Sequence, residues 1–311
     1  MPGLSRRQVL GIAAGAGLGI AIAGLPLTQR TARADDLLLD RNAILENYAA
    51  LYTGTEDSNA HPAVADKIAA IQTRSDQMFG RLRPNSDWVQ YSGVIVDVRL
   101  GLENSTTGAT ASGRMTSTFR ALAEIALATV TPGAASYGDR QRQDRVIEAL
   151  RWVTETYYDV PGDIYTGTGE KYGDWFDWEI GSAHQITMML AFMRDPIADV
   201  DPDLTLYCVD VMHSHLTFEP KFHTGANRAD MTTNYFVQGA LVGDDDAIEE
   251  GISQHLTVMA DIDPVSPVDG ITDGFYEDGS FLHHDNVAYN GSYGKNLLTR
   301  VVNAIKILHG T

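Results

Sequence analysis

The sequence has a single cysteine, Cys208, among 311 residues. One thiol excludes an intrachain disulfide and any cluster of cysteine ligands around a metal. The sequence also offers no clear zinc set, and His213 and His215 are two residues apart, too close for one face of a helix. We interpret both histidines as structural, and we expect neither a metal nor another cofactor.

Basic residues are also few. The chain has 23 Lys and Arg against 41 Asp and Glu, a formal net charge of −18. So acidic a chain does not bind nucleic acid through a general electrostatic footprint. The same charge excludes general attraction of a polyanionic sugar, so an acidic ligand needs a local cationic patch.

Strand patterns are nearly absent, apart from a brief apolar run at residues 94–98. From Leu37 onward, apolar residues recur three and four positions apart, which predicts amphipathic helices. The predicted helices are 39–52, 63–82, 114–130, 145–158, 180–192, 204–216, 231–242, 247–260 and 294–308. No repeat, linker or low-complexity block interrupts them. We therefore expect one all-α domain of antiparallel helix pairs over residues 35–311.

The first 34 residues have the pattern of a signal peptide. Residues 5–10, SRRQVL, form a twin-arginine pattern, and an apolar run over 11–25 precedes the small-residue cleavage site Ala-Arg-Ala at 32–34. A transmembrane anchor is the alternative, but the run is short and rich in glycine. We predict twin-arginine export, cleavage and a secreted chain without membrane contact. Cleavage lowers Lys and Arg from 23 to 19 and the net charge from −18 to −22.

Residues 278–295, DGSFLHHDNVAYNGSYGK, form the stretch richest in chemical groups. Its glycines and asparagines indicate tight turns, and such a loop can present His and Tyr side chains to a ligand. We interpret Ser292 as the N-cap of the last helix. Tyr293 then lies in the first turn, where the helix dipole favours a phenolate. A glycine-rich loop with buried, hydrogen-bonded aromatic residues is the alternative.

Two further stretches are comparably rich in side chains that can bind a ligand. Residues 172–182, YGDWFDWEIGS, offer flat aromatic faces that can stack on sugar rings, although an aromatic core cluster at a helix start is the alternative. Residues 222–231, FHTGANRADM, combine a turn with two groups that can grip a carboxylate. Asn227 can donate two amide hydrogens and Arg228 adds a charge. The alternative there is a turn whose asparagine caps the next helix.

Together, the motifs TGANR, DWxDWEIG and DGSFxxHDNVAYNGSYGK, in this order on a helical exported chain, resemble polysaccharide lyase family 8. That family contains hyaluronate, chondroitin AC and xanthan lyases. The resemblance extends from about Asp36 to the end and is sharp in these three motifs. It implies an incomplete (α/α) toroid of helix hairpins with a long cleft, followed in the family by a β-sandwich region.

By motif position, the resemblance implies that Asn227 neutralises the uronate carboxylate, His284 lies near the C5 proton, and Tyr293 acts as base and then as acid. The residues expected to bind substrate are Trp175, Phe176, Trp178, Arg228, Asn286 and Tyr289. In β-elimination, negative charge develops on the carboxylate, so hydrogen bonds donated to the carboxylate become stronger in the transition state. A tyrosine with a pKa of about 10 needs a cation, a helix N-terminus or hydrogen bonds to act near neutral pH.

The chain departs from the family in its length. The family's catalytic arginine follows the tyrosine by more residues than remain after Tyr293, and Arg300 and Lys306 lie in no matching motif. The β-sandwich domain, with the acid that orients the arginine, is also absent. We therefore expect a truncated N-terminal part, with weak or no activity alone and a C-terminal β-domain part as its missing partner. A truncated gene product, a split enzyme and a fragment remain open.

Three functional hypotheses follow. The first is an exported lyase that cleaves uronate-containing glycans, of hyaluronan or chondroitin type rather than xanthan, by β-elimination. The second is a non-catalytic remnant that binds acidic polysaccharide. The third is a glycoside hydrolase of (α/α)-toroid type, with paired carboxylates drawn from Asp174, Asp177 and Glu179.

Overall fold

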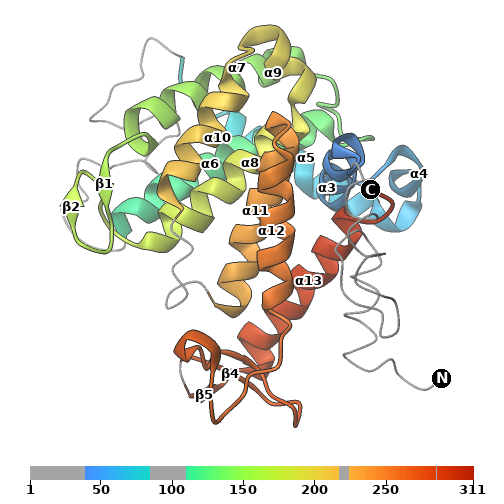
Figure 1. Cartoon of the computed structure of the whole chain (residues 1–311). Coiled ribbons are helices and arrows are strands. Elements are labelled where there is room, and N and C mark those ends of the chain that lie inside the picture. The colour runs from blue at the N-terminus through green and yellow to red at the C-terminus, as the bar shows by residue number, and fades with distance from the viewer. Residues whose placement is uncertain (1–38, 85–109, 217–223, 285) are drawn as a thin grey trace. The chain divides into compact units, whose positions relative to one another are not determined.

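The structure is a computed structural model of the chain (Figure 1). It describes residues 39–84, 110–216, 224–284 and 286–311. The predicted signal peptide and the apolar run at 94–98 lie outside these residues. The chain divides into two compact units, unit 1 with residues 1–48 and 218–311, and unit 2 with residues 49–217. Helix α3 (Arg41–Thr53) contributes to both units, and each unit is described by itself.

Unit 1 consists of helices and one small sheet. Its remaining elements are α11 (Gly225–Val242), α12 (Asp245–Thr257), the 3-10 turn η7 (Val268–Gly270), β3 (Gly274–Phe275), β4 (Phe281–His283), β5 (Val287–Ala288), the π turn η8 (Asn290–Gly294) and α13 (Lys295–Ile307). The strands form an antiparallel sheet in the order β3-β4-β5. Phe275 pairs with Phe281 and His283 pairs with Val287, which fixes the register of β4 at the centre.

Helices α11 and α12 lie side by side as a hairpin (Figure 1). Asp244 caps α12 because its Oδ1 accepts a hydrogen bond from the N–H of Ala247 at 3.0 Å. The two helices approach closely at Gly251, where a Cβ would lie 2.9 Å from the Cβ of Phe236. Only a residue without a side chain permits this separation.

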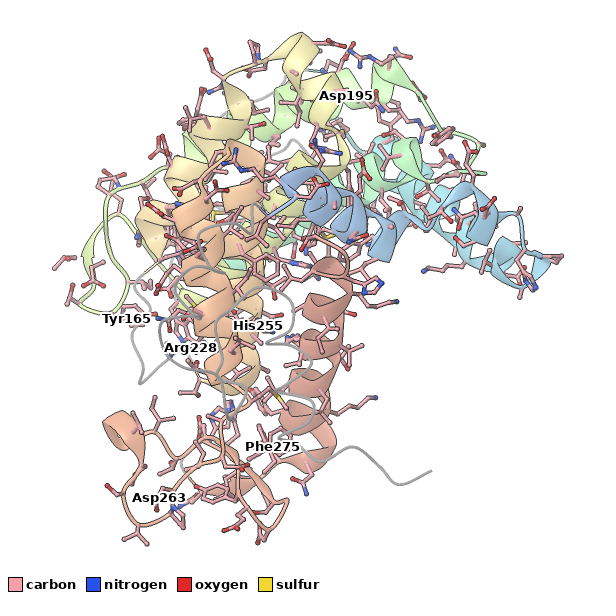
Figure 2. All side chains as sticks on the ribbon, turned by 45° about the vertical axis from the view of Figure 1, so that its right-hand side comes forward. Tyr165, Asp195, Arg228, His255, Asp263 and Phe275 are labelled. Atoms are coloured by element: carbon pink, nitrogen blue, oxygen red, sulfur yellow. The ribbon has the colours of Figure 1, made fainter. Side chains whose placement is uncertain are left out.

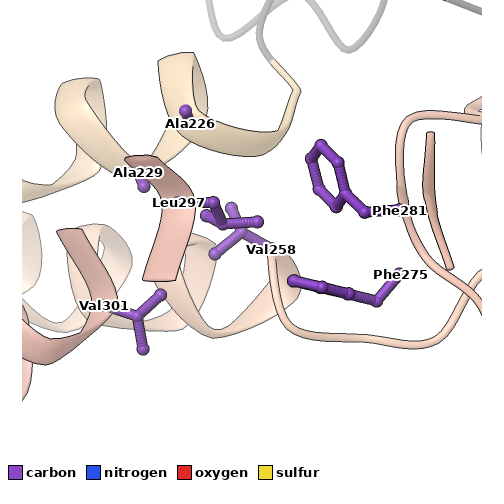
Figure 3. Close-up of a cluster of buried hydrophobic side chains, with 7 residues drawn as sticks. All are labelled: Ala226, Ala229, Val258, Phe275, Phe281, Leu297 and Val301. Carbon is purple, nitrogen blue, oxygen red and sulfur yellow. The ribbon is translucent and has the colours of Figure 1, made fainter. Parts of the chain in front are cut away.

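A single apolar cluster joins these helices to the sheet (Figure 3). Its buried members are Ala226, Ala229, Val258, Phe275, Phe281, Leu297 and Val301. Tyr289 and Tyr293 pack against the same cluster. The core of unit 1 therefore supports the loop that carries both tyrosines.

Unit 2 is built around α6. Its elements after α3 are α4 (Glu56–Asn59), η2 (Pro62–Val64), α5 (Ala65–Phe79), α6 (Thr110–Val130), α7 (Arg140–Val153), η5 (Thr154–Tyr158), β1 (Gly162–Asp163), β2 (Thr168–Gly169), η6 (Asp177–Gly181), α8 (Ser182–Phe192), α9 (Arg194–Val200) and α10 (Leu204–His215). Helix α6 packs against α5, α7 and α8. Phe119, Leu122 and Ile125 are fully buried because neighbours cover more than one face of this helix.

The prediction of an all-α fold is confirmed for the described residues, and a helix occurs at each predicted position. The toroid and the single domain over 35–311 stay predictions. The prediction of Ser292 as an N-cap is wrong: Ser292 lies inside η8, and α13 follows Gly294 without a side-chain cap. Helix α9 is not among the predicted helices. Pro196 lies in the first turn, where a missing N–H breaks no helical hydrogen bond.

Candidate functional site

Two adjacent histidines at the end of strand β4 lie in different environments. Successive side chains of a strand point to opposite faces. Phe281 and His283 are 1% and 2% exposed, whereas Leu282 between them is only partly buried. The strand ends at His283, and His284 has a φ of 53° in the left-handed region. Few non-glycine residues adopt this conformation, and His284 is exposed.

Four aromatic rings meet at this point, and we call them the ring cluster: His283, His284, Tyr289 and Tyr293. The Tyr293 ring stacks on His283 with centroids 4.0 Å apart and makes an edge contact with His284 at 5.2 Å. Tyr289 lies 5.2 Å from Tyr293 and 5.8 Å from His284. The loop is tied to β4, because Asn290 Oδ1 accepts a hydrogen bond from the Phe281 N–H at 3.0 Å.

The first turn of α11 lies beside the same strand. A Cβ at Gly225 would lie 3.4 Å from Nδ1 of His283, and Gly225 has a φ of 50°. This positive φ lets α11 begin six residues before the predicted start at residue 231. Asn227 follows in that turn, and its N–H donates to the Thr224 carbonyl at 3.1 Å. The structure thus places the turn that carries Asn227 against the strand that leads to His284.

Polar groups of the predicted catalytic residues are open to a ligand. Within the described chain, no residue makes a hydrogen bond with the Asn227 amide, the His284 ring nitrogens or the Tyr293 hydroxyl. Tyr293 and Asn227 are half-buried. A half-buried polar group with a free side is suited to bind a ligand. The catalytic roles of these residues stay predictions.

An acidic residue, Asp273, lies beside His283 of the ring cluster. Oδ2 of Asp273 accepts a hydrogen bond from the Thr224 hydroxyl at 2.7 Å and lies 3.3 Å from Nδ1 of His283. Burial lowers the pKa of His283, the Asp273 carboxylate opposes this shift, and His284 adds to it. Burial and His284 thus favour the neutral form of the His283 imidazole. Sequence reasoning did not single out these three residues, although the alternation along Phe281–His283 was a signal that His283 points inward.

Two predicted substrate-binding residues occupy different surroundings. Arg228 lies on α11 (Figure 2), and its guanidinium donates a hydrogen bond from Nη2 to Oε1 of Gln254 on α12. Asn286 is exposed, and its N–H donates to the His284 carbonyl at 2.9 Å. Arg300, which matches no motif, forms an ion pair with Asp230 at 2.5 Å and links α13 to α11. The structure thus gives Arg300 a structural contact and leaves the substrate roles of Arg228, Asn286 and Tyr289 as predictions.

The predicted aromatic patch belongs to unit 2. Trp175 and Phe176 make an edge contact with centroids 6.2 Å apart, and Phe176 is 40% exposed. Both residues precede η6, and Asp174 Oδ1 accepts a hydrogen bond from the Phe176 N–H at 2.9 Å. Their arrival at one cleft with Asn227, His284 and Tyr293 stays a prediction, because those residues belong to unit 1.

Trp178 does not belong to an exposed patch, and this part of the prediction is corrected. Its side chain is 0% exposed and stacks on Tyr158 with centroids 5.8 Å apart. Its indole N–H donates to the Tyr172 carbonyl at 2.8 Å. A fully buried indole belongs to the core. An aromatic core cluster is the alternative that the sequence left open for this motif.

Two acids of the same motif, Asp177 and Glu179, make hydrogen bonds with neighbouring side chains. Asp177 accepts hydrogen bonds from the hydroxyls of Ser112 at 2.8 Å and Thr116 at 2.9 Å, both on α6. Burial raises the pKa of Asp177, and these hydroxyl donors oppose the shift. Glu179 is 2% exposed and accepts a hydrogen bond from the Tyr165 hydroxyl at 2.7 Å. These buried contacts anchor η6 to its neighbours and do not favour the hydrolase hypothesis.

The described residues contain no group of three metal-ligating side chains within reach of one ion. Of the helices in the described part, none is both long enough and apolar enough to span a membrane.

The fold is that of the helical part of known polysaccharide lyases. The structure of Streptomyces coelicolor A3 chondroitin AC lyase in complex with chondroitin sulphate matches with a TM-score of 0.70 at 20% identity, over 87% of this chain and 33% of that one. Hyaluronate lyase HylB of Enterococcus faecalis is 32% identical over 216 residues, which cover 64% of this chain and 20% of that protein. Hyaluronate lyase of Thermasporomyces composti is 28% identical over 310 residues, covering 97% of this chain and 34% of that protein. Xanthan lyases are also among the similar proteins.

Residues 74–311 match polysaccharide lyase family 8, N terminal alpha-helical domain. The chain therefore belongs to polysaccharide lyase family 8. It spans between 20% and 34% of the length of the first curated relatives that it matches.

Proposed function

We propose that this chain provides the tyrosine, histidine and asparagine of a lyase that cleaves uronate-containing polysaccharide, of hyaluronan or chondroitin type, by β-elimination. The observation that carries the proposal is the contact of the Tyr293 ring with His284 at 5.2 Å, with the polar atoms of both side chains open to a ligand. Family membership and the hyaluronate lyases among the relatives support the reaction and the substrate class.

In the proposed reaction, the Asn227 amide donates hydrogen bonds to the uronate carboxylate. These bonds strengthen as removal of the C5 proton moves charge onto the carboxylate. The Tyr293 phenolate takes the C5 proton, and the electron pair of the C5–H bond forms the C4–C5 double bond. The C4–O bond breaks, and the new Tyr293 hydroxyl protonates the leaving oxygen. His284 lies beside the Tyr293 ring, with the ring centroids 5.2 Å apart.

The phenol is tested with Tyr293→Phe, which removes one oxygen. We expect elimination to fall at least about 100-fold, the effect of losing a general base, while glycan binding stays within about twofold. The rate is measured from the ultraviolet absorbance of the unsaturated uronate, with hyaluronan and chondroitin as substrates and the chain at high concentration. The matched control is Tyr235→Phe on α11, which lies outside the ring cluster and keeps the wild-type rate. An unchanged rate in Tyr293→Phe contradicts the role assigned to Tyr293.

The same assay separates the three hypotheses. A lyase produces the absorbance of the double bond together with new reducing ends. A hydrolase produces reducing ends alone, and a binding protein produces neither while it retains the glycan. Reducing ends without absorbance, abolished by Asp174→Asn, favour the hydrolase.

We also propose that residues 1–34 direct export through the twin-arginine pathway. The arginine pair at residues 6 and 7 and the apolar run at 11–25 support this proposal. Replacing both arginines by lysine keeps the charge, and we expect it to leave the uncleaved chain inside the cell. Cell fractionation with immunoblotting measures this, and a single Arg30→Lys substitution is the control. Equal export of the double variant contradicts the twin-arginine route.

A further inference from the structure

Unit 1 contains a buried histidine that the proposed reaction does not use. His283 is 2% exposed and lies against Asp273, Gly225 and Tyr293. Its Nδ1 lies 3.3 Å from Oδ2 of Asp273, and its ring lies against the backbone of Gly225. On one face it stacks on Tyr293 at 4.0 Å, and its ring is nearly parallel to that of Phe281 at 6.1 Å.

The Asp273 carboxylate is itself held in place. It accepts a hydrogen bond from the Thr224 hydroxyl at 2.7 Å, and Thr224 is the N-cap residue of α11. Within the described chain, Nδ1 of His283 has no hydrogen bond of acceptable geometry, so its contact with Asp273 is electrostatic. A carboxylate at this distance orients a neutral imidazole by favouring a proton on Nδ1. Burial lowers the pKa of His283 and so favours the neutral ring.

Stacking limits the motion of Tyr293. The two ring planes are 30° apart, so the phenol cannot tilt toward β4 without displacing His283. The motion of His283 is limited in turn, because Gly225 and Asp273 both lie at the Nδ1 edge of its ring. Misplacement of a reacting side chain by about 1 Å can lower the rate on the order of 100-fold.

We propose that His283 is a positioning residue: oriented by Asp273 and backed by Gly225, its imidazole holds the Tyr293 ring in edge contact with His284 without touching substrate. The kinetic consequence rests on the proposed function. The structural consequence does not, because it concerns only the environment of the Tyr293 ring.

The test separates the face of the ring from its polar edge. His283→Gln keeps a polar group for Asp273 but removes the aromatic face, whereas His283→Phe keeps the face but removes Nδ1. Tyrosine with ¹³C-labelled rings reports on Tyr293 by NMR, with Tyr293→Phe to assign its signal. We expect His283→Gln to shift this signal strongly and His283→Phe to shift it less. The control is His255→Gln, which alters another buried histidine of unit 1 and leaves the Tyr293 signal in place.

The kinetic arm uses the full chain and the absorbance assay. We expect His283→Gln to lower kcat about tenfold or more with KM within about twofold, because a displaced Tyr293 weakens stabilisation of the transition state and not the binding of substrate. His283→Phe recovers part of the loss. If His283→Gln does not fold, Asp273→Asn removes the orienting charge while it retains an acceptor for Thr224, and the same shift and kcat loss are expected.

Two results overturn the inference: a Tyr293 signal in folded His283→Gln that matches the wild type, or an equal fall in kcat for His283→Gln and His255→Gln. A wild-type chain without turnover contradicts the proposed function, and the NMR arm then still decides whether His283 positions Tyr293.

Discussion

At the scale of single residues, the left-handed backbone of His284 indicates that this histidine is present for function and not for stability. A side chain in the left-handed region costs roughly 1–2 kcal/mol, and such residues concentrate where a site demands them. At 53°, the φ of His284 turns the chain out of β4 and lets the imidazole meet the rings of Tyr289 and Tyr293. A residue chosen for stability alone at this position would be glycine.

This comparison yields a prediction for a pair of variants. Both His284→Gly and His284→Ala remove the imidazole, but only glycine relieves the backbone. We expect His284→Gly to be more stable than His284→Ala by about 1 kcal/mol, and both to lose elimination. Urea unfolding followed by circular dichroism measures the difference. Equal stability of the two variants would show that the backbone at His284 is not strained.

At the scale of elements, the sequence predicted the helices well and the turns between them poorly. Apolar spacing marks the long helices because their buried faces repeat at the helical period. The loop over 278–295 has no such period, and its short strands depend on contacts with α11 that lie far away in sequence. Thr224, Asp273 and His283 therefore meet only in three dimensions, and no local pattern indicates that meeting.

Trp178 shows the same limit within one motif. Trp175, Phe176 and Trp178 are equally aromatic in sequence, yet Phe176 is 40% exposed and Trp178 is 0% exposed. The difference arises because the indole N–H of Trp178 is bound by the Tyr172 carbonyl and its ring is covered by Tyr158. Burial is set by these partners and not by residue type.

Close packing of α11 and α12 gives a prediction at this scale. Alanine favours a helix over glycine by roughly 1 kcal/mol. At Gly251, however, a Cβ would lie 2.9 Å from the backbone N and the Cβ of Phe236, which cannot move without shifting α11. We expect Gly251→Ala to destabilise the chain by about 1–3 kcal/mol, the usual cost of overpacking. Denaturant unfolding monitored by far-ultraviolet circular dichroism measures this.

The matched control is a helical glycine with room around it. A Cβ at Gly113 on α6 would meet only Oδ2 of Asp177, at an ordinary 3.7 Å. Gly113→Ala should therefore leave stability unchanged or raise it by up to about 1 kcal/mol. A gain in both variants would show that the helix pair relaxes without cost.

At the scale of the whole molecule, each unit contains a histidine that folding keeps uncharged. Burial lowers the pKa of His255 in unit 1 to about 4, and it lowers that of His215 in unit 2 to about 4. His255 contacts the Thr232 hydroxyl at 2.9 Å, and His215 contacts the Tyr158 carbonyl at 2.9 Å. In the unfolded chain both return to a pKa of about 6.5. Between these two values, the unfolded chain binds more protons than the folded one.

Stability is therefore full above about pH 6.5 and is lost as the pH falls toward 4. From pH 7 to pH 5, we expect each histidine to remove about 2 kcal/mol from the free energy of unfolding by this linkage. The carboxylates of this acidic chain also titrate at the lower end, so the informative quantity is the difference between variants. His255→Gln and His215→Gln should each make the fall in the free energy of unfolding between pH 7 and pH 5 smaller by about 2 kcal/mol, the contribution of one histidine. This difference does not depend on the stability of the variant at pH 7.

The tryptophans allow this difference to be assigned to a unit. Trp152, Trp175 and Trp178 lie in unit 2, and the described part of unit 1 contains no tryptophan, so their fluorescence reports on unit 2, whereas circular dichroism reports on both units. His215→Gln should flatten the pH dependence seen by fluorescence. His255→Gln should flatten it in circular dichroism, and in fluorescence only if the two units unfold together. A wild-type free energy of unfolding that stays constant or rises from pH 7 to pH 5, with parallel curves in both variants, would show that neither histidine is held uncharged by the fold.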